Sequence, residues 1–138
     1  MKLRSFALFG ASAKKKKFGN MILAAMNKKY MRIYPMHRSA NFIDGLRAFS
    51  AFEELPEKPA GVILVIPPGE TEHVIDDIIA AGIKNVWFQQ GSVSDKAVRY
   101  CMLNGINVIS NECVLMFLDN PGFPHNLHKW VWSIGAGK

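Results

Sequence analysis

Residues 5–26, SFALFGASAKKKKFGNMILAAM, decide how this chain of 138 residues begins to fold. They comprise an apolar strand from Phe6 to Phe9, a turn at Gly10-Ala11-Ser12, four lysines at 14–17, and a helix that begins at Phe18-Gly19-Asn20. A glycine in such a turn lets backbone amides approach a ligand closely, and the free N–H groups that open a helix favour an anion. The stretch therefore predicts a phosphate-binding loop, to which the lysines add positive charge.

The spacing of this loop excludes two common phosphate motifs. The next glycine after Gly10 is Gly19, so the glycines of the dinucleotide fingerprint are missing, and Lys17 is followed by Phe18 where a P-loop has Ser or Thr. The motif alone leaves open an ordinary strand-to-helix connection with a solvated run of lysines.

Composition indicates one globular domain. The chain has 49% hydrophobic residues, and its apolar runs fall well short of the roughly 20 residues that a membrane-spanning helix needs. The amino-terminal residues lack the pattern of a signal peptide. We therefore expect a cytoplasmic protein without membrane contact, in which Cys101 and Cys113 are reduced thiols.

Charge is distributed unevenly along the chain. Residues 1–50 contain 11 Lys or Arg and one acid, whereas residues 51–138 contain six Lys or Arg and ten acids. Such a field attracts an anion to one side of the fold. Aromatic residues do not alternate with the lysines as they do on single-strand-binding surfaces, so nucleic acid is not an expected partner.

Apolar segments and helical patterns alternate along the chain. We predict strands at 6–9, 30–34 (ended by Pro35), 61–66, 85–89 and 107–110, helices at 18–29, 71–81 (capped by Thr71) and 94–104, and a last short helix that opens at 111–113. Between the second and third strands we expect a turn at Asp44-Gly45, a short strand at 46–49 and one helical turn at 51–55. This order predicts a doubly wound α/β fold, with a mainly parallel sheet of about five strands and helices on both faces.

Ligands of such sheets bind outside the carboxyl ends of the strands. These ends are predicted at 10–12, 35–38, 67–68, 89–91 and 111–113. After the second strand, Met36-His37-Arg38 is basic, whereas an NAD site has an acid there that holds the ribose. The pattern disfavours NAD and favours an adenosine ligand with an additional ribose phosphate, unless His37 and Arg38 are simply exposed at a strand end.

Residues 119–138 depart from the alternating pattern and are expected to form an arm rather than a separate domain. They contain Trp130 and Trp132, which we expect to pack on the domain or to form a homodimer with a second subunit. The pair His125-x-x-His128 lacks the further ligands of a zinc site, so we expect no metal.

These features together resemble a small stand-alone protein of the Rossmann-like CoA-binding family, similar to the amino-terminal domain of the succinyl-CoA synthetase α subunit. The resemblance covers residues 6–113, within an expected domain of 1–118, and rests on segments at Gly10-Ala11-Ser12, Phe18-Gly19-Asn20, Tyr34-Pro35, Gly45, Val62 to Ile66, Val86 to Gly91, and Cys113. The sequence departs from the family pattern at Met36-His37-Arg38, where relatives commonly have Val-Asn-Pro, and at Val114, where a proline is usual.

The resemblance implies how CoA would lie along the strand ends. Its pyrophosphate would contact Gly10, Ala11, Ser12 and the helix start at Gly19-Asn20; lysines 14–17, chiefly Lys16 and Lys17, would hold the ribose 3′-phosphate together with Arg38. Adenine would lie near Pro35, Met36 and His37, and the pantetheine arm would pass Pro67 and Gln89-Gln90-Gly91 toward Cys113.

The predicted function is therefore non-catalytic or regulatory binding of CoA or an acyl-CoA. No catalytic set can be assembled from the sequence, because His37, His73 and Glu112 are far apart and His73 is expected to be an exposed surface residue. Cys113, at an expected helix start, should have a lowered thiol pKa and could form a mixed disulfide with CoA. The alternatives are an NADP-type or other nucleotide-binding regulator and a detached subunit of an acyl-CoA ligase.

Overall fold

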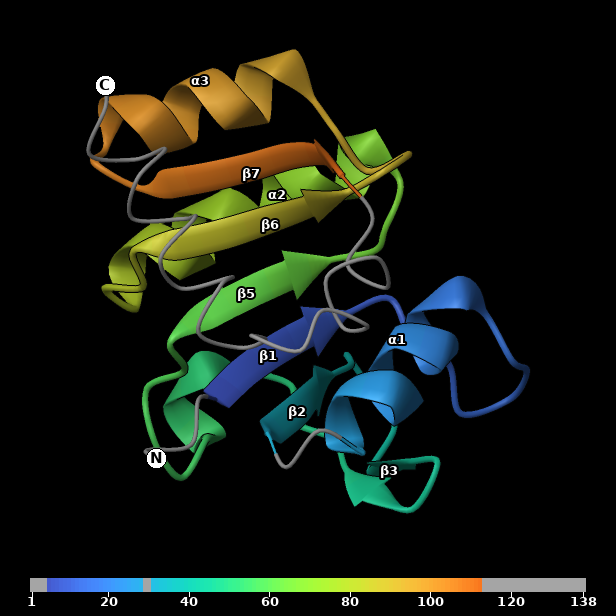
Figure 1. Ribbon diagram of the computed structural model, residues 1–138. Helices are drawn as coiled ribbons and strands as arrows, with labels where there is room; N and C mark the ends of the chain where they lie inside the picture. The colour runs from blue at the N-terminus through green and yellow to red at the C-terminus, as the bar shows by residue number, and fades with distance from the viewer. Residues whose placement is uncertain (1–4, 29–30, 113–138) are drawn as a thin grey trace.

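The computed structural model describes residues 5–28 and 31–112, which form a parallel sheet with helices on both faces (Figure 1). The sheet has five strands in the order β2-β1-β5-β6-β7. These strands are β1 (Ser5–Phe9), β2 (Arg32–Met36), β5 (Gly61–Leu64), β6 (Asn85–Gln89) and β7 (Asn107–Glu112). The predicted α/β architecture is confirmed.

Alternate residues of each strand face opposite layers of the core. Leu8 and Ile63 pack with Ile22, Leu23 and Met26 of α1 (Phe18–Asn27) on one face of the sheet. On the other face, a second cluster packs the sheet against α2 (Pro68–Ala80) and α3 (Asp95–Leu103); it includes Ala7, Val62, Leu64, Ile75, Ile78 and Cys101. The sheet is thus covered on both faces, as its apolar strands require.

A small hairpin lies beyond the β2 edge of the sheet, next to α1 (Figure 1). It consists of β3 (Phe42–Ile43) and β4 (Leu46–Arg47), and the predicted turn at Asp44-Gly45 joins them with φ angles of 51° and 82°. Positive φ suits glycine and is tolerated by aspartate. A single 3₁₀ turn, η1 (Phe52–Glu54), follows where one helical turn was predicted.

Several predicted boundaries are wrong for local reasons. Pro35 does not end β2 but pairs with Leu8 inside it, which is possible because β2 is an edge strand and its outer side can lack an N–H donor. Thr71 does not cap α2: the helix begins at Pro68, a residue favoured in the first turn, and the Thr71 hydroxyl donates to the Pro68 carbonyl at 2.6 Å.

Two further boundaries differ at the sheet. Strand β5 ends at Leu64 rather than Ile66. Asn111 and Glu112 continue β7 instead of opening a helix, and the remainder of that predicted helix lies outside the described residues, as do Cys113 and the Trp-containing arm. None of the helices within the described ranges has the length and apolar character needed to span a membrane.

Candidate ligand site at the carboxyl ends of the first two strands

The glycine turn after β1 is held in place by close backbone packing. Gly10 has a φ of +120°, and a Cβ atom on it would lie 2.1 Å from the carbonyl oxygen of Val65. A Cβ atom on Gly19 would lie 2.5 Å from the carbonyl oxygen of Gly10. Gly10 is therefore required for the β1 turn to pack against Val65, and Gly19 for the first turn of α1 to pack on the β1 turn, independently of any ligand.

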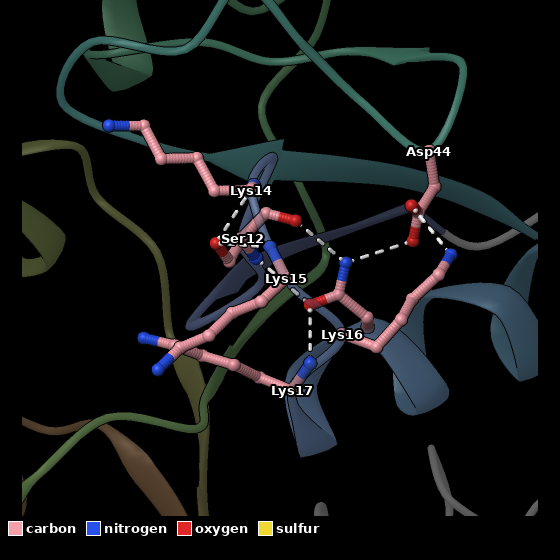
Figure 2. A network of polar contacts seen from close by, with 7 residues as sticks. Ser12, Lys14, Lys15, Lys16, Lys17 and Asp44 are labelled. Atoms are coloured by element: carbon pink, nitrogen blue, oxygen red, sulfur yellow. Dashed lines mark hydrogen bonds and ion pairs between the residues drawn. The ribbon is translucent and has the colours of Figure 1, made fainter.

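The lysine loop, shown with Ser12 and Asp44 in Figure 2, is organised by the side chain of Asn20, which is 2% exposed. Its Oδ1 accepts hydrogen bonds from the backbone N–H groups of Ser12 at 2.9 Å and Lys17 at 3.1 Å. Its Nδ2 donates to the Ser12 carbonyl and to Asp44 Oδ2, both at 2.9 Å. These contacts use both amide hydrogens and two acceptor positions, so Asn20 shapes the loop rather than offering a free group to a ligand.

Lys16 and Lys17 have different surroundings although they are neighbours. The Lys16 ammonium forms an ion pair with Asp44 Oδ1 at 2.9 Å across the gap to the hairpin, with the Lys16 side chain 79% exposed. Hydrogen bonds from Asn20 and then Lys16 hold the pKa of Asp44 below its usual value. Lys17 instead lines a pocket at the strand ends. The sequence alone could not separate these two lysines.

This pocket, which we call the strand-end pocket, has a volume of about 440 Å³. Its lining comes from β1 and its turn, from the end of β2 and the segment after the hairpin, and from the β5–α2 connection with the first turns of α2. The residues are Phe9, Gly10, Ala11, Lys17, Met36, His37, Arg38, Ser50, Ile66, Glu70, His73, Val74 and Asp77.

Six of the predicted site residues meet in the strand-end pocket, namely Gly10, Ala11, Lys17, Met36, His37 and Arg38. Its lining does not include Ser12, Lys16, Phe18, Gly19, Asn20, Pro35, Pro67, Gln89, Gln90 or Gly91. Of these, Ser12, Gly19 and Asn20 build the loop beside the pocket, whereas Gln89 to Gly91 lie at the end of β6, with β5 between β6 and β1. Cys113 lies outside the described residues.

The α2 wall of the pocket was not predicted from the sequence. Glu70, His73, Val74 and Asp77 follow the helical spacing i, i+3, i+4, i+7, which places them on one side of α2. That spacing, directly after a strand end, was the available signal. His73 is exposed, as expected, but it also lines the same pocket as His37.

The two walls of the pocket carry opposite charge. Lys17 and Arg38 lie on the side of β1 and β2, and the carboxylates of Glu70 and Asp77 lie on the α2 side. His37 Nδ1 accepts hydrogen bonds from the backbone N–H groups of Ser39 at 3.1 Å and Ala40 at 2.9 Å, which hold the imidazole ring against the segment after β2. Such a pocket suits a ligand with anionic groups at one side and hydrogen-bond donors at the other.

Comparison with known proteins identifies the family. The sequence profile described as a CoA binding domain matches residues 4–119, which is most of the chain. The chain belongs to this CoA-binding domain family. The match agrees with the resemblance seen in the sequence, and no ligand set of three or more His, Cys, Asp or Glu residues suited to a metal occurs among residues 5–28 and 31–112.

Solved structures with the same fold include both small proteins and part of a large enzyme. A conserved hypothetical protein from Pyrococcus furiosus is 30% identical, with a TM-score of 0.77 over 83% of this chain and 99% of that one. A hypothetical protein from Pyrococcus horikoshii is 23% identical, with a TM-score of 0.77 over 83% and 81% of the two chains. Acetyl-coenzyme A synthetase 1 of Ca. Korarchaeum cryptofilum is 24% identical, with a TM-score of 0.67 over 76% of this chain but 25% of the synthetase.

Proposed function

We propose that the protein binds CoA or an acyl-CoA in the strand-end pocket, in a non-catalytic or regulatory role. One observation carries the proposal: the pocket brings the glycine turn of β1, with Gly10 and Lys17, together with the basic end of β2 at His37 and Arg38. Membership of the CoA-binding domain family supports the same ligand. In parallel sheets, this edge is the usual place for a nucleotide.

The charges of the pocket suggest how the ligand is oriented. Phosphates are repelled by Glu70 and Asp77, so the pyrophosphate lies toward Gly10, Ala11 and Lys17. The adenine then lies between the end of β2 and α2, where the carboxylates can accept hydrogen bonds from its exocyclic amine. This arrangement uses both walls of the pocket.

The pantetheine arm extends along the sheet edge toward the end of β6. Strand β5 separates β1 from β6, so the arm crosses about 10 Å, or two strand spacings, to reach the turn at Gln90-Gly91. An extended pantetheine is long enough for this distance. The terminal thiol or acyl group would then lie beyond β6, which keeps it away from the polar strand-end pocket.

Isothermal titration calorimetry with CoA, dephospho-CoA and NADPH tests the proposal. The variant Lys17→Gln/Arg38→Gln should bind CoA at least about tenfold more weakly, because it loses two charge-assisted contacts to phosphate. The matched control is Lys96→Gln/Arg99→Gln, which removes the same two charges from α3 at the opposite edge of the sheet (Figure 1). Binding of NADPH but not of CoA would instead favour an NADP-type regulator.

The non-catalytic role is tested separately with acetyl-CoA. His37 and His73 line the pocket, but the described residues provide no nucleophile hydrogen-bonded to either imidazole. We therefore expect acetyl-CoA incubated with the protein to release free thiol no faster than in buffer. Release that increases with protein concentration and is lost in His73→Gln would contradict a purely binding role.

A further inference from the structure

A second pocket adjoins the first on the side of the hairpin. This hairpin pocket has a volume of about 370 Å³ and shares Arg38 and Ser50 with the strand-end pocket. Its lining comes from the segment after β2, the β3–β4 hairpin and η1; the residues are Arg38, Ser39, Ala40, Asn41, Phe42, Arg47, Ala48, Ser50 and Glu54. The two pockets thus meet at a shared arginine.

The hairpin pocket is lined by two arginines and one carboxylate, so its net charge is positive. Its carboxylate, on Glu54, accepts hydrogen bonds through Oε1 from the backbone N–H groups of Ser50 at 2.8 Å and Ala51 at 3.2 Å, and from the Ser50 hydroxyl at 3.0 Å. These bonds to Ser50 and Ala51, with a smaller contribution from the charge of Arg47, keep the pKa of Glu54 low and hold Oε1 at the start of η1. Neither Arg38 nor Arg47 forms an ion pair with any residue in the ranges 5–28 and 31–112.

Arg47 is held in place by an aromatic ring. Its guanidinium carbon lies 5.1 Å from the centre of the Phe49 ring, within cation–π distance. Phe49 is itself anchored to the end of β2, because its N–H donates to the Pro35 carbonyl at 3.0 Å and its carbonyl accepts from the N–H of His37 at 2.8 Å. A guanidinium restrained in this way loses less conformational freedom when it binds an anion.

We infer that the hairpin pocket receives the ribose 3′-phosphate of CoA, held between Arg38 and Arg47, and that Arg47 determines the preference for CoA over dephospho-CoA. The inference rests on the proposed function, which places the adenosine at the end of β2. The 3′-phosphate and the 5′-pyrophosphate are attached to different carbons of the ribose, so the 3′-phosphate needs a second anion site beside the first. Arg38, which lines both pockets, lies where these two sites would meet. Two guanidinium groups can clamp one phosphate through paired N–H donors.

In this proposal the 3′-phosphate binds at the hairpin pocket and not at the lysine loop, where the family resemblance had placed it. Lys16 is already paired with Asp44, whereas Arg47 forms no ion pair within 4.0 Å among the described residues, although its charge contributes to the lowered pKa of Glu54. Arg47 comes from β4, a segment in which the sequence showed a connection and no ligand residue. It gains its position through the hairpin, which folds back beside the end of β2.

Calorimetric titration of the full chain with CoA and dephospho-CoA tests the inference. The wild-type protein should bind CoA about tenfold or more tightly than dephospho-CoA, since the 3′-phosphate adds charge-assisted hydrogen bonds. Arg47→Gln should weaken CoA binding about tenfold and leave dephospho-CoA binding within about twofold. Arg47→Lys keeps the charge but loses the paired donors, so its affinity for CoA should lie between those of the wild-type protein and Arg47→Gln. Arg99→Gln on α3 is the matched control.

The possible outcomes separate this inference from the function on which it rests. If the wild-type protein binds both ligands equally, or if Arg47→Gln weakens both equally, CoA binding stands and the role of Arg47 is refuted. If neither ligand binds, both proposals fail together. Thermal melting of each variant shows whether it is folded. Titration with NADPH and NADH gives a second pair of ligands that differ by one ribose phosphate. If Arg47→Gln weakens the binding of NADPH more than that of CoA, the pocket binds a 2′-phosphate and the inference is overturned.

Discussion

Asn20 donates from Nδ2 to Asp44 Oδ2 at 2.9 Å and thereby joins the first turn of α1 to the tip of the β3–β4 hairpin. The same side chain closes the lysine loop through Ser12 and Lys17. Because the hairpin carries Arg47 and the loop carries Lys17, this amide fixes the relative position of the two segments that we propose hold the phosphates of CoA.

Asn20→Ala should therefore destabilise the protein substantially. The substitution leaves the N–H groups of Ser12 and Lys17 without their acceptor in a partly buried place, and such losses cost about 1–3 kcal/mol each when the group stays unpaired. We expect a decrease of about 2–4 kcal/mol in the free energy of unfolding, measured by urea denaturation. Asn27→Ala, an exposed position at the end of the same helix, should change it by less than about 0.5 kcal/mol, and equal effects at the two sites would refute the role of Asn20.

Gly19→Ala should disrupt the strand-end pocket by steric conflict. The added methyl group would lie 2.5 Å from the Gly10 carbonyl oxygen and 2.9 Å from the Ala11 nitrogen, both of them backbone atoms that can move only with the turn. We expect a lower melting temperature together with loss of CoA binding. Gly69→Ala is the matched control, because the site is open and helical, and it should be neutral or slightly stabilising. A fully stable Gly19→Ala variant would show that the turn can relax.

The strands of the sheet could be predicted because local sequence patterns determine them. Asn85–Gln89 was placed correctly, since the apolar run is bounded by turn residues on both sides, and the helix predicted at 94–104 is α3, with Ser94 as its N-cap. Errors occurred where a neighbour decides the outcome. Pro35 can continue β2 because β2 lies at the sheet edge, and residue order alone does not show which strand is at the edge.

The site was predictable only in part, because its walls come from distant segments. Gly10, His37 and Arg38 could be found from strand ends. The assignment of Lys16 to Asp44, 28 residues later, depends on how the hairpin folds back, and so does the position of Arg47 beside Arg38. These pairings depend on tertiary structure and leave no pattern in the local sequence.

Lys16 and Lys17 should differ in their effect on ligand binding. Lys17→Gln removes a cation from the strand-end pocket and should weaken CoA binding about tenfold, in line with the loss of one charge-assisted contact. Lys16→Gln removes an exposed ion pair and should change CoA affinity by less than about threefold and leave stability almost unchanged. If Lys16→Gln has the larger effect on affinity, the lysine loop rather than Lys17 contacts the ligand.

Tyr34 should ionise at unusually high pH. Burial, and then the hydrogen bond from its hydroxyl to Glu57 Oε2 at 2.5 Å, raise its pKa from 10.0 to about 12. Because the folded state holds this proton more tightly than the unfolded state, the stabilisation is complete below pH 10 and is lost as the pH rises toward 12. In a pH titration, the difference in tyrosinate absorbance between the wild-type protein and Tyr34→Phe should have its midpoint near pH 12. Glu57→Gln should lower this midpoint. A midpoint near 10 in the wild-type protein would contradict this environment.

Cys101 should be inert in the folded protein. Its side chain is fully buried between α3 and the sheet, and burial raises the pKa of the thiol from 9.0 to about 12, so almost no reactive thiolate exists at neutral pH. In Cys113→Ser, where Cys101 is the remaining cysteine, an aromatic disulfide reagent should react rapidly in concentrated urea and very slowly in native buffer. Rapid native reaction would mean that α3 opens readily. Oxidised CoA can form a mixed disulfide with a protein thiol and release one CoA thiol. If Cys101 is inert, this disulfide must form on Cys113. The intact mass should then increase after treatment with oxidised CoA in the wild-type protein and not in Cys113→Ser.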